Sequence, residues 1–195
     1  MLVRMAFSFA KTAYQKMTDL ERIELISSRT ADFWSNAPGW APKEAADLLS
    51  KSRLDWLDSF NRTLRSRVQD VTDHPDEPAV LILAWAHLRT VVEGHLKLFL
   101  AVFLIDYLKD QHAPLAKSGP KNPDKLGYEE IRVFLVKRGL LVEHHAFIDT
   151  VQQRGNAIHA FADRPIGRTK EYLEYVGHYR QFLENIEASL PNRCV

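Results

Sequence analysis

The sequence predicts an all-α protein: an antiparallel bundle of about six helices in one domain spanning residues 1–195. Apolar residues recur at helical spacings of three and four along most of the chain. No six-residue window alternates in the way of a half-buried strand rich in β-branched residues. The length of 195 residues suits a single domain, and turns rich in proline and glycine separate the periodic segments.

The first two predicted helices are separated by a turn containing two prolines and a glycine. The first helix runs from a capping box formed by Thr18 and Glu21 to about Trp34. After the turn, Pro42 suits the first position of a second helix, which continues to about Asp70. Short connections of this kind favour antiparallel neighbours.

A third helix is predicted from Pro78 to about Asp110, and it is apolar on nearly all sides. Such a helix belongs at the centre of a bundle. It would be roughly 50 Å long unless Gly94 bends it. Its apolar stretch 79–104 is long enough to span a bilayer, but it carries charges that are costly in hydrocarbon, so we expect a buried core helix and no membrane span.

Residues 111–127 form a 17-residue segment with three prolines and three lysines. Segments of this length without regular structure are functional or disordered, and the composition here favours disorder. Three further helices are predicted, at about Tyr128 to Arg138 before Gly139, about Glu143 to Phe161, and about Thr169 to Leu190 before Pro191.

Composition excludes several classes of protein. Lys and Arg total 26 and Asp and Glu 25, so a nucleic-acid surface must be a local patch rather than a global field. The single cysteine, Cys194, excludes disulfide scaffolds and cysteine zinc sites, and a reducing cytoplasm is the expected location. The N-terminus lacks the continuous apolar core of a signal peptide.

Several common site types are absent, among them a glycine-rich phosphate loop and a nucleophile elbow. No set of Asp, Glu, His or Cys side chains has metal-ligand spacing, so we expect no metal and no cofactor. His87 and His95 on the third helix read best as structural histidines. Arg89 and Glu93 lie four apart on that helix, either as a structural ion pair or with Glu93 orienting a catalytic group nearby.

The most informative segment is 148–163. An apolar stripe would comprise Ile148, Val151, Gly155, Ile158 and Ala162, and beside it a polar stripe would comprise Gln152, Asn156, His159 and Asp163. Gly155 inside a helix costs about 1 kcal/mol relative to alanine, which indicates close approach of another backbone or a substrate.

Arg154 and His159 are five residues apart, about 140° around an ideal helix, so one side chain cannot simply reach the other. Either the helix ends or bends between them, or the two groups meet through a second copy of the chain. Capping polar groups at a helix end would also explain the pattern.

The segment Arg154-Gly-Asn-Ala-Ile-His159 resembles the R-x4-6-H motif of the HEPN superfamily (higher eukaryotes and prokaryotes nucleotide-binding). The continuation to Pro191 is similar to uncharacterised bacterial HEPN-like proteins, and the segment Leu88 to Glu93 resembles the central helix of that family. The resemblance covers about residues 79–191, the HEPN-like core, whereas 1–78 match only as generic helices.

This resemblance implies a bundle that forms a homodimer, with the helix of Arg154 and His159 at or near the interface. Many members are metal-independent endoribonucleases, often in toxin–antitoxin or phage-defence systems. His159 would move a proton as general acid or base, and Arg154 would meet the phosphate charge. Asn156 would assist them, with Glu93 and Arg89 in support. The expected products are a 2′,3′-cyclic phosphate and a 5′-hydroxyl.

The chain departs from the family pattern after the arginine, where many active members have a polar residue and this sequence has Gly155. An alternative is therefore a catalytically silent HEPN-like module that binds a nucleotide, an RNA or a protein partner. Expected partners are RNA, a second copy, and an antitoxin or nucleotidyltransferase. The residues expected to bind substrate are Gln152, Arg164, Arg168 and Lys170.

Overall fold

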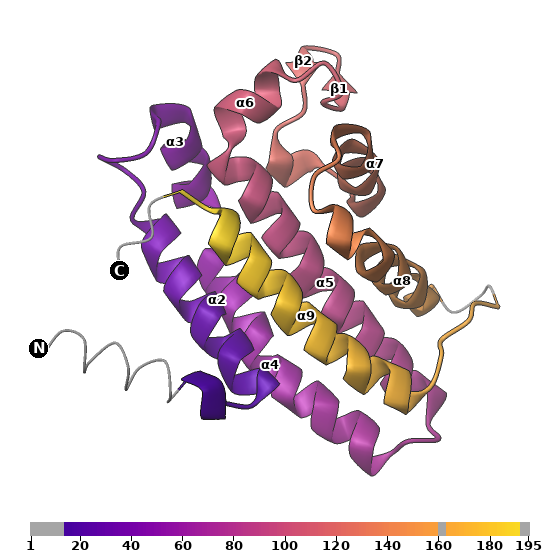
Figure 1. Ribbon diagram of the computed structural model, residues 1–195. Helices are drawn as coiled ribbons and strands as arrows, with labels where there is room; N and C mark the ends of the chain where they lie inside the picture. Colours follow the sequence, from indigo (N-terminus) through magenta and orange to yellow (C-terminus); the bar gives the residue numbers. More distant parts are fainter. Residues whose placement is uncertain (1–13, 160–162, 192–195) are drawn as a thin grey trace, which may run out of the picture.

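The computed structural model describes residues 14–159 and 163–191, and these ranges are predominantly α-helical, as the sequence predicts (Figure 1). The α-helices are α2 (Asp19–Ser35), α3 (Lys43–Lys51), α4 (Leu54–Asp73), α5 (Pro78–Val102), α6 (Leu104–Lys109), α7 (Tyr128–Arg138), α8 (His145–Gly155) and α9 (Thr169–Ser189). The remaining regular elements are the strands β1 (Leu115–Ala116) and β2 (Gly119–Pro120) and the 3₁₀ turns η1 (Pro123–Lys125), η2 (Val142–His144) and η3 (Asn156–Ile158).

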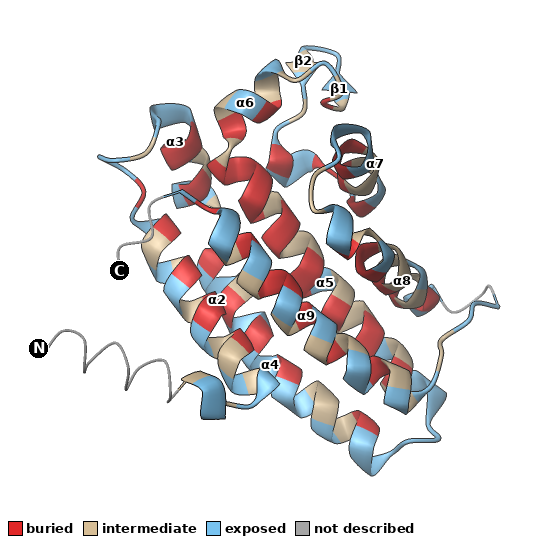
Figure 2. Ribbon diagram, in the orientation of Figure 1, coloured by how far each residue is buried: buried red, intermediate tan, exposed pale blue. Residues whose placement is uncertain are grey.

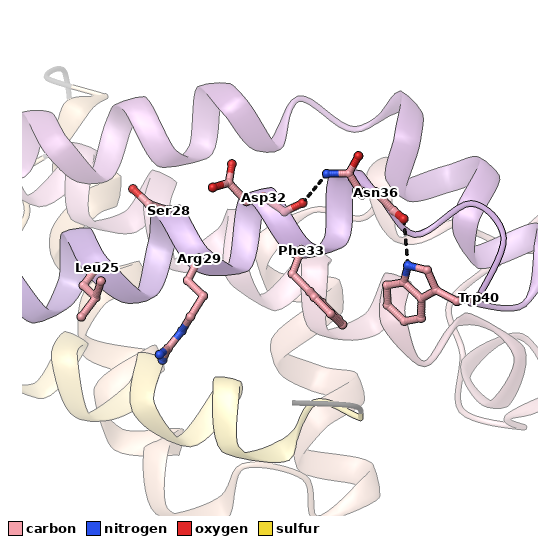
Figure 3. Close-up of a pocket in the computed structure, with 7 residues that line it drawn as sticks. All are labelled: Leu25, Ser28, Arg29, Asp32, Phe33, Asn36 and Trp40. Atoms are coloured by element: carbon pink, nitrogen blue, oxygen red, sulfur yellow. Dashed lines mark hydrogen bonds between the residues drawn. The ribbon is translucent and has the colours of Figure 1, made fainter. Parts of the chain in front are cut away.

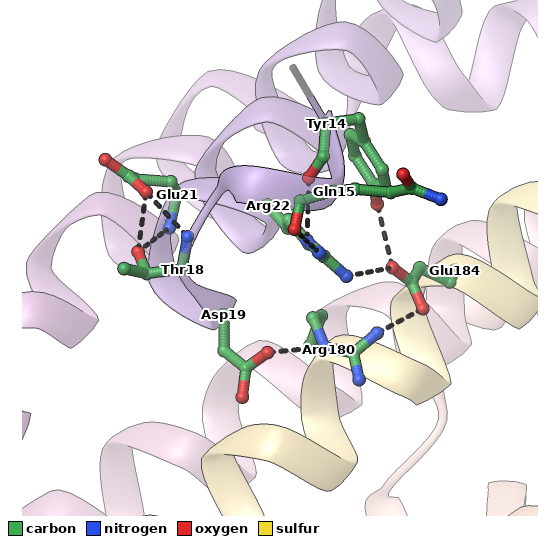
Figure 4. Close-up of polar contacts among 8 residues, drawn as sticks. All are labelled: Tyr14, Gln15, Thr18, Asp19, Glu21, Arg22, Arg180 and Glu184. Atoms are coloured by element: carbon green, nitrogen blue, oxygen red, sulfur yellow. Dashed lines mark hydrogen bonds and ion pairs between the residues drawn. The ribbon is translucent and has the colours of Figure 1, made fainter. Parts of the chain in front are cut away.

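The start of α2 is fixed by the predicted capping box and by a tie to α9. Thr18 accepts from the backbone N–H of Glu21, and the Glu21 carboxylate accepts from the backbone N–H of Thr18 at 2.7 Å. Arg180 of α9 lies 2.6 Å from a carboxylate oxygen of Asp19 and also pairs with Glu184 (Figure 4). These contacts hold the first turn of α2 against a helix that is far away in the sequence.

The prediction of one continuous second helix is wrong, because α3 and α4 are separate. Ser52 has an extended backbone (ψ 137°), and its hydroxyl donates to the carbonyl of Leu48 at 2.9 Å. Leu49 and Leu54 are both buried although they are five residues apart, which is about 140° on a continuous helix. The break at Ser52 brings both side chains into the core.

The third predicted helix begins at Pro78 as expected but ends at Val102 instead of Asp110. The backbone leaves the α-helix at Phe103, and α6 then buries Leu104 and Tyr107. The helix continues without a break through Gly94, whose absent side chain admits α4. A Cβ at Gly94 would lie 2.5 Å from Cδ1 of Leu57.

The expectation of disorder for residues 111–127 is wrong. The strands β1 and β2 pair there as an antiparallel hairpin, and η1 follows. The Tyr107 hydroxyl donates to the carbonyl of Lys121 at 2.8 Å, and the Lys121 ammonium pairs with Glu130 of α7. These anchors, which join groups nine and fourteen residues apart, order the segment despite its loop-like composition.

The central position predicted for α5 is confirmed. It packs against α3, α4, α8 and α9, and α2 covers the outer side of α4 and α9. Buried residues run along α5 for most of its length (Figure 2). Within the described part of the chain, no helix is both long enough and apolar enough to cross a membrane.

A buried polar network lies inside this core between α2, α4, α5 and α9. His95 Nδ1 lies 2.9 Å from the carbonyl of Val91 and 3.1 Å from the hydroxyl of Tyr179, which donates to Asn61 at 2.6 Å. The Asn61 amide in turn donates to Ser27 at 3.0 Å. Each hydrogen bond of this network has one donor and one acceptor when the Nδ1 atom of His95 carries the proton. The interpretation of His95 as a structural histidine is therefore confirmed.

We expect the stability of the fold to decrease below pH 6.5 because of His95. Burial lowers the pKa of His95 from 6.5 to about 4, so between these values the unfolded chain binds a proton that the folded chain does not. Stability is therefore lost as pH falls, by about 2 kcal/mol from this residue between pH 7 and pH 5. Urea unfolding at both pH values measures it.

In that experiment His95→Gln should be less stable at pH 7 but should show a shallower pH dependence than wild type. His74→Gln, at an exposed imidazole on the end of α4, is the matched control. An equal pH dependence in wild type and His95→Gln would contradict the assignment.

Candidate functional site

Arg154 lies in the last turn of α8 and reaches toward the start of α9. Its Nε and Nη2 donate to one carboxylate oxygen of Glu171, at 3.2 and 2.8 Å, and Nη1 donates to the carbonyl of Pro165 at 2.8 Å. The side chain is 19% exposed. In the free chain, Arg154 therefore ties α8 to the α8–α9 connection and to the first turn of α9.

Gly167 permits this arrangement. Its φ of +72° lies in the left-handed region, and a Cβ there would be 2.1 Å from Oε2 of Glu171 and 3.3 Å from Nε of Arg154. A side chain would thus meet both strain and the carboxylate. Neither Glu171 nor Gly167 was among the candidate residues, because in the sequence Glu171 reads only as an acid suited to the first turn of a helix.

His159 lies just beyond the end of α8. The prediction of a helix from Glu143 to Phe161 is wrong, because α8 ends at Gly155 and continues only as the 3₁₀ turn η3. The backbone N–H of His159 donates to the carbonyl of Asn156 at 3.2 Å, and the backbone then leaves the helix (ψ 70°). The imidazole is exposed at the start of the connection that Arg154 holds at Pro165.

Because the helix ends, the two predicted stripes do not continue past Gly155. Ile158, assigned to the apolar stripe, is 42% exposed, and Ala157 is buried in its place. Phe161 and Ala162 lie outside the described residues. The first alternative for Arg154 and His159, a helix that ends between them, is the one observed.

Gly155 lies where α8 packs against α5. A Cβ at this position would lie 2.6 Å from Cβ and from Cδ of Arg89. The sequence predicts close approach of a backbone or a substrate at Gly155, whereas the structure places the aliphatic stem of an arginine side chain there.

Arg89 and Glu93 pair only weakly. The Arg89 Nη2 lies 3.7 Å from Glu93, whose other oxygen lies 2.9 Å from the ammonium of Lys97. The guanidinium carbon of Arg89 lies 5.1 Å from the ring centre of Tyr128, which burial keeps neutral by raising its pKa above the ordinary value. Among the described residues, Glu93 does not contact Arg154 or His159. The charged groups of Arg89 and Glu93 therefore make their contacts on α5 and α7.

Gln152 and Asn156 face α7, on a different side of α8 from Arg154. They line a shallow polar depression of about 290 Å³, the α7–α8 groove, which is formed by Glu129, Arg132, Asp149, Gln152, Gln153 and Asn156. Gln152 donates to Glu129 at 2.8 Å, and hydrogen bonds from Arg132 and Gln152 lower the pKa of Glu129 to about 2. Most polar side chains that line the groove are thus already paired with one another by ion pairs and amide hydrogen bonds.

The three basic residues expected to bind substrate lie on the connection and the start of α9. Arg164, Arg168 and Lys170 are all exposed, and Lys170 has only a distant partner, Glu174, at 3.9 Å. They lie on the part of the chain that follows His159, together with the exposed acid Asp163. The structure therefore brings Arg154, His159 and these cations to one connection and leaves Gln152 and Asn156 in the α7–α8 groove.

A larger depression, of about 590 Å³, lies away from these residues on the outer face of α2, where its lining includes Phe33 and Trp40 (Figure 3). The rings of Phe33 and Trp40 pack on each other with centroids 4.7 Å apart. The indole N–H of Trp40 donates to the carbonyl of Asn36 at 2.8 Å. Over the described residues, no group of three or more His, Cys, Asp or Glu side chains is placed to hold a metal ion.

Comparison of the chain with protein-family models, with curated proteins and with solved structures gave no match.

We expect Gly155→Ala to destabilise the fold by about 1–3 kcal/mol, because its Cβ would overlap the stem of Arg89. Gly177→Ala is the matched control. Its Cβ would meet only the exposed carboxylate of Asp19, at 3.2 Å, so helix propensity makes it neutral or stabilising by up to about 1 kcal/mol. Chemical unfolding of both variants measures the difference, and equal stabilities would contradict the close packing at Gly155.

Proposed function

We propose that this chain is a homodimeric, metal-independent endoribonuclease of the HEPN type, acting as a toxin or phage-defence effector in the cytoplasm. The observation that carries the proposal is the end of α8 between Arg154 and His159. It directs Arg154 into the α8–α9 connection and leaves His159 exposed at the start of that connection. The exposed Arg164 and Arg168 on the same segment supply charge for a polynucleotide.

The chemistry follows from the residue types. An imidazole exchanges protons near neutral pH, so His159 takes the proton of a ribose 2′-hydroxyl or gives one to the departing 5′-oxygen. The 2′-oxygen attacks the adjacent phosphorus, the bond to the 5′-oxygen breaks, and a 2′,3′-cyclic phosphate and a 5′-hydroxyl result. One chain offers one such imidazole at this connection, whereas a twofold dimer offers a base and an acid.

Exposed apolar side chains on α4, α5 and η3 are the surface we assign to the dimer. Phe60 of α4 contacts His87 of α5, and Leu83 lies one turn from His87 on the same helix. Phe60 is 45% and Leu83 49% exposed, and Ile158 on η3, which packs against α5, is 42% exposed. Burial of these side chains would stabilise a dimer beside His159.

A specific observation also favours the second candidate, a catalytically silent module that binds nucleotide, RNA or a protein partner. The guanidinium of Arg154 donates to Glu171 and to the carbonyl of Pro165. A phosphate must therefore displace an existing ion pair to reach this guanidinium. The polar residue that many active relatives carry after the arginine is replaced by Gly155, which packs on Arg89.

Cleavage separates the two candidates. We expect the wild-type chain to cut RNA in the presence of excess EDTA, and His159→Ala to reduce the rate by about 10²–10⁴, as the loss of a general acid or base does. His178→Ala, at an exposed imidazole on α9, is the control that should cut normally. The measurement is gel analysis of labelled structured and single-stranded RNA, with identification of the end groups.

RNA binding without cleavage in the wild type would replace the nuclease by the binding module. Cleavage that EDTA abolishes while His159→Ala retains it would contradict the mechanism.

The dimer has its own test. Sedimentation at micromolar concentration should give the mass of two chains, and Leu83→Glu should shift the mass toward one chain by placing a charge in the apolar contact. Leu115→Glu, on the β1–β2 hairpin and 74% exposed, is the matched control that should remain dimeric. A wild-type mass of one chain that does not change with concentration would contradict the dimer.

A further inference from the structure

Arg89 is weakly bound for a partly buried arginine. It is 28% exposed, its Nε is buried without a hydrogen-bond partner, and its one ion pair, to Glu93, is 3.7 Å long. Arg22, Arg132, Arg154 and Arg180 are buried to a similar degree. Each of those four donates hydrogen bonds to a carboxylate or a backbone carbonyl within the described residues. The Nε of Arg180 also lacks a hydrogen bond, but it lies 2.6 Å from a carboxylate oxygen of Asp19.

The buried Nε of Arg89 has an energetic cost because it has no acceptor. A buried donor left without an acceptor destabilises the folded state, and more so when the group is charged. The ring of Tyr128 under the guanidinium offsets part of that cost as a cation–π contact, since the centroid is 5.1 Å away. An anionic ligand at this position would satisfy the rest.

The position of Arg89 coincides with the end of α8. Its stem crosses the backbone at Gly155, which lies between Arg154 and Asn156, and only a glycine leaves room for it. Gly155 therefore leaves the space in which the stem of Arg89 packs against the backbone of the motif, and the guanidinium lies over Tyr128 of α7. Arg154 itself is occupied by Glu171 and Pro165.

We propose that Arg89 binds a phosphate of the RNA at the end of α8, and that Arg154 in this chain mainly holds the connection after His159. The proposal rests on the proposed function and names the residue that recognises its substrate. The guanidinium fork matches two oxygens of a phosphodiester.

The charges around Arg89 are compatible with this role. Glu93 is shared by Arg89 and Lys97, so it remains paired with Lys97 at 2.9 Å when Arg89 turns to a phosphate. On α7, Arg132 pairs with both Glu129 and Asp149 and neutralises one of these two negative charges, so the α7–α8 side keeps one net negative charge. The α5 side thus carries one net positive charge, from Arg89 and Lys97 against Glu93.

The test follows the Nε–Hε signal of Arg89 by NMR of the full-length chain while inorganic phosphate, and separately a short single-stranded RNA, is added. Arg89→Met keeps the aliphatic stem against Gly155 and removes the charge, and Arg89→Lys keeps the charge without the fork. Arg65→Met, which removes an exposed arginine paired with Glu24, is the matched control. Fluorescence anisotropy at several salt concentrations gives the affinity of each variant for RNA.

We expect RNA and phosphate to shift the Arg89 signal. Arg89→Met should bind RNA about tenfold more weakly, with the slope of log affinity against log salt reduced by about 0.7, the value of one single-strand phosphate contact. Arg89→Lys should recover the salt slope but only part of the affinity. Arg65→Met should match wild type, and thermal unfolding checks that each variant is folded.

The outcomes separate this proposal from the proposed function. RNA cleaved and bound equally by wild type and folded Arg89→Met would overturn the role of Arg89 and leave the nuclease standing. A phosphate-dependent shift of Arg89 with RNA bound but uncut would support the anion site and overturn the nuclease. An Arg89 signal that moves with neither phosphate nor RNA overturns the role of Arg89 whatever the cleavage result.

Discussion

The burial of the greater part of α5 is the constraint on which the rest of the structure depends. A helix packed against four others can bury a polar group only where a neighbouring group forms a hydrogen bond or an ion pair with it. His95 hydrogen-bonds to Tyr179 and Val91 inside the core. Glu93 forms an ion pair with Lys97 at the edge that faces α7 and α8. Arg89 is the member of this series whose partners are weakest. The chemistry of the candidate site is therefore a consequence of how the central helix is covered.

The packing of α8 on α5 also decides how the motif is displayed. Gly155 brings the two helices together, and the residues on either side of it are directed apart. Arg154 points to Glu171 of α9, and Asn156 lines the α7–α8 groove. The motif residues of one chain are thus distributed over two neighbouring surfaces, which limits what a single subunit can assemble around one phosphate.

Signals that depend on a few consecutive residues were predictable from the sequence. The capping box of Thr18 and Glu21, the proline start at Pro78 and the left-handed stop at Gly139 all occur where expected. Each follows from backbone chemistry that needs no distant partner. A close neighbour at Gly155 was predictable, because a glycine in a helix has an energetic cost, but its identity as the stem of Arg89 rather than a backbone or a substrate was not.

What could not be predicted depends on contacts between distant segments. The break at Ser52 follows from two surfaces that α3 and α4 must bury, and hydropathy alone does not show where one surface ends. The ordering of residues 111–127 depends on Tyr107 and Glu130. The pairing of Arg154 with Glu171 spans seventeen positions, and several other acids were equally available in the sequence.

The Arg154–Glu171 pair has a consequence for how this chain can change in length. Because the pair closes a loop of seventeen positions, it anchors both ends of the α8–α9 connection independently of what lies between them. Closing a longer flexible loop is inexpensive, about 0.6 kcal/mol for a doubling of its length. Insertions between His159 and Pro165 would therefore be absorbed outside the bundle. An added recognition element, or an engineered tag, at this connection would leave the Arg154–Glu171 pair in place.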